Sequence, residues 1–214
     1  LDRYNSADAA AFRDQLFEKG LSSSSVKRTF ASIRSIVNLS IKEYGLSCDK
    51  AFAQTFIPDR NDITKRLPIP TAHLRLIQKA CRITDDDPRW LIALISDSGM
   101  RLAEAACLLK ADIQLDHEIP NVSLKPDAWR QLKTASSERL MPLVNTSLWA
   151  ARRALGYKDT EFAFTRFTNA TQCNSNSASA TLNKWMEPLV PHGCVIHSFR
   201  HNLRDRFGAT ETPS

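Results

Sequence analysis

The chain has 214 residues, of which 43% are hydrophobic, and a formal net charge of +6. This length and apolar content suffice for one large domain or two modest ones, each with its own core. No apolar run approaches the roughly 18 residues that a membrane span needs, so we expect no membrane partner. The moderate basic excess excludes the dense lysine blocks of a disordered tail and only weakly favours a polyanionic partner.

The five cysteines form an odd set without a C-x-x-C pair, and three of them lie in apolar or helical stretches. This pattern predicts reduced, buried thiols in a cytoplasmic protein, with neither a disulfide framework nor a zinc site. The chain does not begin with Met and shows no signal pattern. We therefore expect a piece of a longer protein.

Two helices are predicted at the start of the chain. Ser6 can cap the first, which ends before Gly20. Serines at 22–25 can cap the second, which runs to Gly45. Their apolar residues recur at helical spacing, with Ala9, Phe12, Leu16 and Phe17 on the first and Val26, Phe30, Ile33, Val37, Ile41 and Tyr44 on the second.

Basic residues on the second helix are candidates for DNA contact. Lys27 and Arg34 lie two turns apart and share a face, and Arg28 lies on its flank. That face is suited to meet a DNA backbone, and a solvated helix surface would explain the same residues equally well.

Residues 58–70 combine three prolines with mixed charges and lack any sustained period, which is typical of a linker. We therefore expect a small helical domain over residues 1–57 and a second domain over residues 71–214.

The second domain is predicted to be mostly helical with one small sheet, so the fold class is mainly α (α+β). Short, partly alternating segments predict a three-stranded antiparallel sheet, and residues 168–180 predict a loop. The strands are expected at 120–124, 130–133 and 139–143, and the helices from Thr71, over 87–98, 102–109, 147–155, 179–188 and 197–207. Of these helices, the one over 87–98 is nearly all apolar and should be buried at the centre of the domain.

The last predicted helix carries a cluster of positive charge. His197, Arg200, His201 and Arg204 are spaced by three, four and seven residues, so they project from one face. Such a cluster repels itself unless an anion lies between its members, and arginine forks match phosphate oxygens. Phe199, Leu203 and Phe207 are expected to form the opposite, packed face. A basic solvated surface is the alternative for the helix taken alone.

Two further segments place polar residues that suit the same chemistry. Arg101 follows a glycine turn at the start of a helix, where backbone N–H groups favour anions, and Glu104 is one turn later, placed to pair with an arginine. Lys133 lies in a predicted hairpin, from which an ammonium group can reach a substrate.

The motifs SGMRLAEA, LKTASSERLMPL and HSFRH, in this order and at these separations, resemble the catalytic domain of the tyrosine recombinases, the phage-integrase family. The resemblance covers most of residues 71–207, and residues 1–57 look more loosely like the core-binding domain of that family. It implies an enzyme that breaks and rejoins DNA through a 3′-phosphotyrosyl link, without a metal or other cofactor.

The resemblance also implies roles for individual residues. Arg101 and Arg200 would clamp the non-bridging phosphate oxygens, Lys133 would be the general acid, and His197 would assist proton transfer at the nucleophile. Glu104 would support the arginines, and His201 would make a phosphate or structural contact. Arg204 would join the basic residues of the second helix in binding DNA.

The chain departs from the family pattern because it ends before the expected nucleophile. We interpret Tyr44 as a core residue and Tyr157 as a loop residue, and Tyr4 also lacks the right context. We therefore expect a fragment that binds duplex DNA without cutting it. The parent enzyme is expected to be a tetramer on DNA, of bacterial or phage origin, while a monomer stays open for the fragment.

Two alternatives remain from the sequence. A type IB topoisomerase-like enzyme shares the Arg, Lys and HxxR chemistry but relaxes supercoils, although the separate helical domain before the linker favours a recombinase. A DNA-binding regulator with a recombinase fold and no catalysis is the other.

Overall fold

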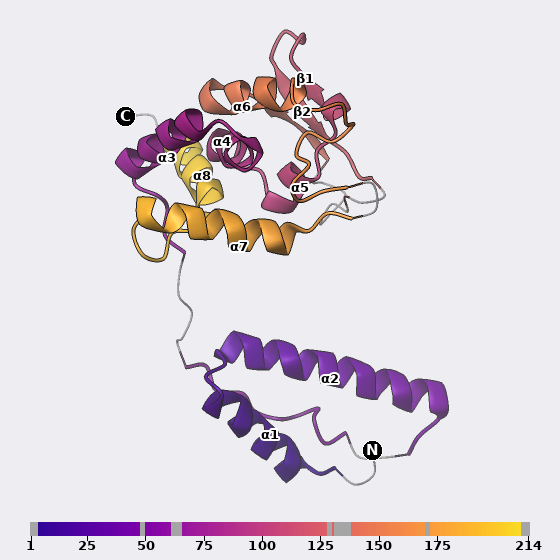
Figure 1. The fold of residues 1–214 in the computed structure, drawn as a ribbon. Helices are drawn as coiled ribbons and strands as arrows, with labels where there is room; N and C mark the ends of the chain where they lie inside the picture. Colours follow the sequence, from indigo (N-terminus) through magenta and orange to yellow (C-terminus); the bar gives the residue numbers. More distant parts are fainter. Residues whose placement is uncertain are drawn as a thin grey trace. The chain divides into compact units, whose positions relative to one another are not determined.

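The computed structural model describes residues 4–47, 50–60, 66–127, 130, 138–169 and 172–210. The chain divides into two compact units, Leu1–Lys65 and Arg66–Ser214, whose boundary lies within the predicted linker segment 58–70. Figure 1 shows the helices of each unit, which we describe separately.

The first unit contains two helices, α1 (Ser6–Glu18) and α2 (Ser23–Tyr44). Asn5, rather than Ser6, caps α1 by accepting hydrogen bonds from the backbone of residues 7 and 8, whereas Ser22 caps α2 as predicted. The core of this unit contains Ala9, Leu16, Phe17, Val26 and Phe30.

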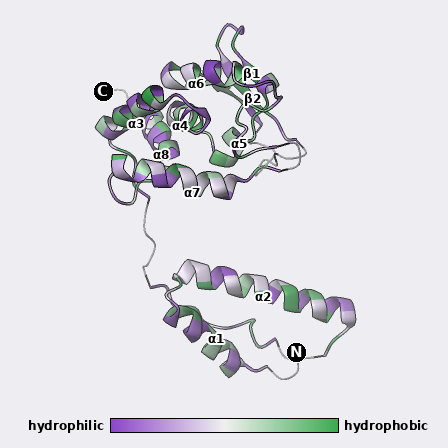
Figure 2. Ribbon diagram, in the orientation of Figure 1, coloured by the Kyte–Doolittle hydropathy of each residue, from purple (hydrophilic) through white to green (hydrophobic). Residues whose placement is uncertain are grey.

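The prediction that Tyr44 is a core residue is wrong, because 77% of this residue is exposed. At about 1.5 Å per residue, the 22 residues of α2 extend much further than the 13 residues of α1 can cover. Burial along α2 therefore falls towards its end. Green and purple segments alternate along this helix in Figure 2, so a helical apolar period continues beyond the part that is buried.

Both ends of the predicted linker are packed against the unit that they join. On the first unit, the Arg60 guanidinium lies 3.8 Å from the centre of the Phe17 ring, and the Arg60 backbone N–H donates to the Ser23 hydroxyl. On the second unit, Ile69 is buried and its N–H donates to Asn202 Oδ1 at 2.9 Å, while Asn202 Nδ2 donates back to the Ile69 carbonyl at 2.6 Å.

The second unit is built around one buried helix, α4 (Asp87–Ser98). In Figure 1 the helices α3, α6 and α8 lie around α4, and the residue contacts agree. The other elements of this unit are α3 (Thr71–Thr84), α5 (Leu102–Ala106), η1 (Lys110–Asp112), β1 (Ile113–Gln114), β2 (Asn121–Leu124), β3 (Arg139–Pro142), α6 (Asn145–Leu155), α7 (Ser175–Met186), η3 (Glu187–Leu189) and α8 (Ser198–Thr210).

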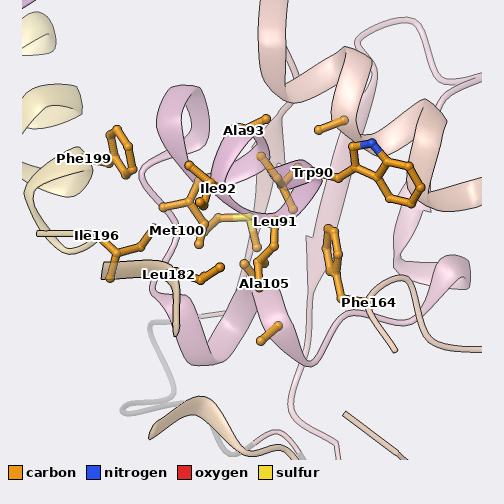
Figure 3. Packing of buried hydrophobic residues seen from close by; sticks show 14 of the residues in the cluster. Trp90, Leu91, Ile92, Ala93, Met100, Ala105, Phe164, Leu182, Ile196 and Phe199 are labelled. Atoms are coloured by element: carbon orange, nitrogen blue, oxygen red, sulfur yellow. The ribbon is translucent and has the colours of Figure 1, made fainter. Parts of the chain in front are cut away.

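The prediction that α4 is central to the core is confirmed. Asp86 caps the helix, Pro88 lies in its first turn, and Gly99 ends it with a φ of 60°, a left-handed conformation that glycine adopts without strain. Figure 3 shows Leu91, Ile92 and Ala93 of α4 among side chains contributed by α5, α7 and α8. This packing brings the end of α4 and the start of α8 together, which positions the site described below.

The sheet is three-stranded and antiparallel, in the order β1-β2-β3, as the fold class required, but its strands differ from those predicted. The first strand is 113–114, which we had not predicted, and β2 pairs directly with β3. Arg130, expected to begin a strand, lies outside the strands and is buried, with its guanidinium bound to Asp112 at 2.6 Å and to the Cys107 carbonyl at 3.3 Å. Its Nε also donates to the Lys125 carbonyl at 2.9 Å, so the side chain binds three partners at once, which local alternation cannot reveal.

The prediction of reduced thiols alone is also wrong. Cys107 and Cys173 form a disulfide, with Cα atoms 5.9 Å apart and a separation of 66 positions in the chain. Cys81 and Cys194 are free and buried, as expected. The pairing escaped prediction because no spacing rule joins cysteines that only the folded chain brings together.

Several helix ends also differ from the prediction: α5 stops at Ala106, and α7 begins at Ser175, inside the predicted loop. On α8, Phe199 is buried as predicted, but Phe207 is 59% exposed. Phe207 borders a cavity instead of the core. Among the described residues, no helix is long and apolar enough to cross a membrane.

Candidate phosphate-binding site

The site begins where α4 passes into α5. Gly99 turns the chain at the end of α4, and Arg101 is the residue that precedes α5, with an extended backbone. Glu104, in the first turn of α5, accepts a hydrogen bond from the backbone N–H of Arg101 at 3.0 Å. This local pairing fixes the start of the short helix and holds both side chains close to its first turn.

The Glu104 carboxylate joins two arginines from different parts of the chain. Arg101 Nη1 donates to Glu104 Oε1 at 2.6 Å, and Arg139 Nη2, from β3, donates to Glu104 Oε2 at 2.8 Å. Burial by itself would raise the pKa of Glu104, but the hydrogen bonds from Arg139 and Arg101 outweigh burial and lower it. Glu104 is therefore an ionised anchor between two guanidinium groups.

Arg200 approaches the same place from α8. Its Nη1 donates to the Gly99 carbonyl at 3.2 Å, two residues before Arg101. Burial lowers the pKa of Arg200, and the positive charges of Arg101 and Arg139 lower it further, whereas Glu104 opposes them. Three arginines are thus close enough to affect one another electrostatically, and an anion among them would relieve that repulsion.

Two histidines lie beside the arginines at the start of α8. The rings of His197 and His201 have centroids 5.4 Å apart and meet edge to face. Partial burial lowers the pKa of His197, and Arg66, His201, Arg200 and Arg101 lower it further through their positive charge. The lowered pKa favours the neutral ring of His197, which can accept a proton.

A cavity of about 400 Å³ opens among these side chains. Part of its wall is basic and part is apolar. It is lined by Gly99, Arg139, Met141, His197, Arg200, His201, Leu203, Arg204 and Phe207.

The structure brings together most of the site residues predicted in the second unit. Arg101, Glu104, His197 and Arg200 are linked by the contacts and charges given above, and His201 shares the cavity. Arg204 also lines the cavity, with its side chain 74% exposed and paired to Asp205. Lys133 lies outside the described residues.

The basic residues predicted on α2 have different surroundings. Arg34 is half-buried and donates to the backbone carbonyls of Phe52 and Thr55, so it holds the segment after α2 in place. Lys27 and Arg28 are exposed, and Lys27 pairs with Asp59 at 3.2 Å.

Sequence reasoning missed two basic residues near the site, Arg139 and Arg66. Arg139 and Met141 are less exposed than Leu140 and Pro142 on either side, so the alternation in β3 puts an arginine on the inward face. An apolar pattern alone favours the opposite register, with Leu140 inside. Arg66 lies just before α3, in the segment that we predicted to be a linker.

One of the three tyrosines belongs to the second unit. Tyr157 packs edge-on against the Trp90 ring in the second unit, with centroids 5.0 Å apart. Tyr4 and Tyr44 belong to the first unit. Within the described part of the chain, the residues lining the cavity include no tyrosine.

Comparison with solved structures shows which fold this is. The chain is similar to the Tn1549 transposon integrase in complex with circular intermediate DNA, with 16% identity over 99% of this chain and 75% of the other and a TM-score of 0.67. It is also similar to a lambda integrase dimer bound to a COC′ core site (12% identity, 99% and 74% covered, TM-score 0.68). A third similar structure is that of the XerA recombinase, with 13% identity over 99% of this chain and 71% of the other and a TM-score of 0.52.

These proteins are tyrosine recombinases, so the chain has the tyrosine-recombinase fold, and the resemblance seen in its motifs is confirmed at the level of the fold. No protein-family model matches the chain, and neither does any curated protein.

Proposed function

We propose that this protein binds duplex DNA through the phosphate backbone and is the DNA-gripping part of a site-specific tyrosine recombinase. One observation carries the proposal: Arg200 and His197 line one basic cavity, and Arg101, which is far from both in the sequence, lies close enough to lower the pKa of each through its positive charge. Three cationic or proton-carrying groups at one place suit a phosphodiester better than a neutral ligand.

The chemistry of the cavity follows from these groups. The forks of Arg101 and Arg200 can each hold two non-bridging oxygens and stabilise the extra negative charge of a five-coordinate transition state. We assign His197 to proton transfer at the attacking oxygen and Lys133 to protonation of the leaving 5′-oxygen. The structural neighbours support the choice of ligand, because two of those reported above are complexes with DNA.

We propose further that these 214 residues bind DNA without forming a covalent link to it. A phosphotyrosyl link needs a tyrosine hydroxyl in line with the phosphorus atom. Tyr157 is packed against Trp90, and the cavity residues that are described include no tyrosine. A regulator that binds DNA through this fold is the second candidate, and the same observation favours it.

A single set of measurements tests the proposal. The affinity for a short labelled duplex is measured between about 50 and 200 mM salt, where phosphate contacts produce a steep linear loss. The variant Arg101→Gln/Arg200→Gln should bind more weakly and with a smaller salt slope. An affinity that changes neither with salt nor with the double substitution would overturn the proposal. A nicked duplex incubated with the protein and resolved under denaturing conditions should give no covalent adduct.

A further inference from the structure

Arg139 also lines the basic cavity, although it belongs neither to the motif at the start of α8 nor to the motif that contains Arg101. Arg139 comes from β3, and its side chain is 26% exposed. It lines the cavity together with Arg200 and His197. Its neighbour Met141 lines the cavity as well, so the inward face of β3 forms one wall.

Glu104 fixes where the Arg139 guanidinium lies. The carboxylate is buried, with the residue 4% exposed, and it uses Oε1 for the Arg101 side chain and Oε2 for Arg139. Arg101 and Arg139 are therefore held on one rigid anion. A guanidinium has five N–H donors, so binding a carboxylate and a phosphate at the same time is within its capacity.

The charges around Glu104 do not balance. Among the described residues that act on one another here, Arg101, Arg139 and Arg200 contribute three positive charges against the single negative charge of Glu104, an excess of two. Arg139 also acts on Arg200 electrostatically. An ion pair that served only to neutralise Glu104 would need one arginine, and Arg101 already supplies it at 2.6 Å.

We propose that Arg139 is a third phosphate-binding arginine of this site, held in position by Glu104 and acting with Arg101 and Arg200. This proposal rests on the proposed function, in which the ligand is a DNA phosphate. It adds β3 to the elements that grip the backbone, so the phosphate is held from α8, from the start of α5 and from the sheet.

The test uses the whole chain, a short labelled duplex and the substitution Arg139→Gln. Glutamine keeps an amide N–H that can still donate to Glu104 but removes the charge that a phosphate would meet. We expect affinity to fall about tenfold or more, and the slope of log affinity against log salt to fall by about 1, equally on two duplexes of unrelated sequence. Arg139→Lys should restore the slope but not the full affinity, because lysine lacks the fork.

The control is Arg152→Gln, which removes an exposed arginine from α6, a helix that contributes no residue to the cavity lining. It should change neither affinity nor slope. If Arg139→Gln unfolds the protein, Arg139→Lys keeps the charge beside Glu104 and carries the test: affinity should fall with an unchanged salt slope, and wild-type affinity would contradict phosphate binding by the guanidinium fork.

The outcomes separate the two proposals. A normal salt slope in folded Arg139→Gln, with a reduced slope in Arg101→Gln/Arg200→Gln, would show that Arg139 only neutralises Glu104. Normal slopes in both variants would overturn the proposed function itself.

Discussion

His197 is the residue whose charge should respond most to an occupied cavity. Burial and four neighbouring positive groups lower its pKa below the ordinary value of 6.5 in the free protein. A phosphate bound beside it would favour the protonated ring and raise that pKa. Protons are therefore taken up on binding, and affinity for DNA should increase as the pH falls through this range.

We expect the increase to be at most about tenfold per pH unit, which is the limit for one linked proton. The measurement is DNA affinity between about pH 5 and pH 8 at constant salt. His197→Gln should flatten the profile. His192→Gln, which changes an exposed histidine of another groove, should leave the profile as it is. An unchanged profile in His197→Gln would contradict this assignment.

The contribution of His197 to the folding stability of the DNA-free protein should depend on pH in the opposite sense to DNA affinity. Because the folded pKa of His197 is lowered, the folded state resists protonation of the ring. Its contribution is fully favourable above the unfolded pKa of about 6.5 and decreases as the pH falls below that value. A fall in pH should therefore lower the folding stability of the DNA-free protein and raise its affinity for DNA.

At the scale of elements, the contact between α4 and α8 depends on Gly99. A Cβ atom at this position would lie 2.6 Å from Leu203 Cδ2 and 2.9 Å from Leu203 Cβ, and the φ of +60° is unfavourable for other residues. Gly99→Ala should therefore push α8 away and displace Arg200, whose Nη1 donates to the Gly99 carbonyl.

Gly45 offers a matched control, because it ends α2 with a φ of +59° and a Cβ there would meet no described atom within 4 Å. Gly45→Ala should cost only the left-handed strain of about 1–2 kcal/mol. Gly99→Ala should cost more, by about 1–3 kcal/mol for the forced repacking, and should also weaken DNA binding. Urea unfolding of both variants measures the difference. Equal losses of unfolding free energy would show that α8 can move away from a Cβ atom at position 99 without a further energetic cost.

The disulfide joins the end of α5 to the segment before α7. Cys107 follows α5 directly, and the Thr168 hydroxyl donates to the Ala106 carbonyl next to it. The bridge spans 66 residues, for which chain entropy predicts a stabilisation of about 4 kcal/mol. We expect a reducing agent to lower the melting temperature.

Cys107→Ser/Cys173→Ser should melt at a temperature that the reducing agent does not change. Cys81→Ser is no substitute as a control, since burial raises the pKa of that thiol to about 12 and a hydroxyl there would disturb the core. Thiol counting under denaturing conditions is the independent check: a protein with all its thiols reactive before reduction would contradict the bridge.

These elements also show what a sequence can reveal. The helix α4 was predictable because its capping residue, its apolar run and its closing glycine agree with one another. The grouping of Arg101, Glu104 and Arg200 came from motifs in the chain. The prediction for Tyr44 was wrong because an apolar period indicates only which face of a helix can be buried. The length of the partner helix decides how much of that face is buried.

Contacts between distant segments explain the remaining differences. Arg139 was missed as a site residue because a four-residue strand fits either register, and only pairing with β2 selects the one that turns the arginine inward. The disulfide and Arg130 depend likewise on partners that the sequence does not place next to each other.

At the scale of the whole molecule, the described residues of the phosphate site all belong to the second unit. The cations of the first unit are therefore expected to add contacts without changing the grip itself. Lys27→Gln/Arg28→Gln should weaken DNA binding and reduce the salt slope by up to about 2, while the pH profile set by His197 stays the same.

Arg34→Gln is the contrasting variant. Because Arg34 donates to the carbonyls of Phe52 and Thr55, its loss should lower the stability of the first unit before it affects the salt slope. Measuring urea unfolding and DNA affinity on both variants separates the two roles. If Lys27→Gln/Arg28→Gln binds as wild type does, α2 contributes no phosphate contact through these residues.

The pair of hydrogen bonds between Asn202 and Ile69 connects two parts of the second unit that are far apart in the sequence. Ile69 lies where the chain enters the second unit, and Asn202 lies on α8, two residues after Arg200. The segment that enters the second unit is thus bound to α8, the helix that carries Arg200. Cys194, shortly before α8, also donates from its Sγ to the Leu67 and Pro68 carbonyls, so a displacement of this segment would reach both α8 and the residues that precede it.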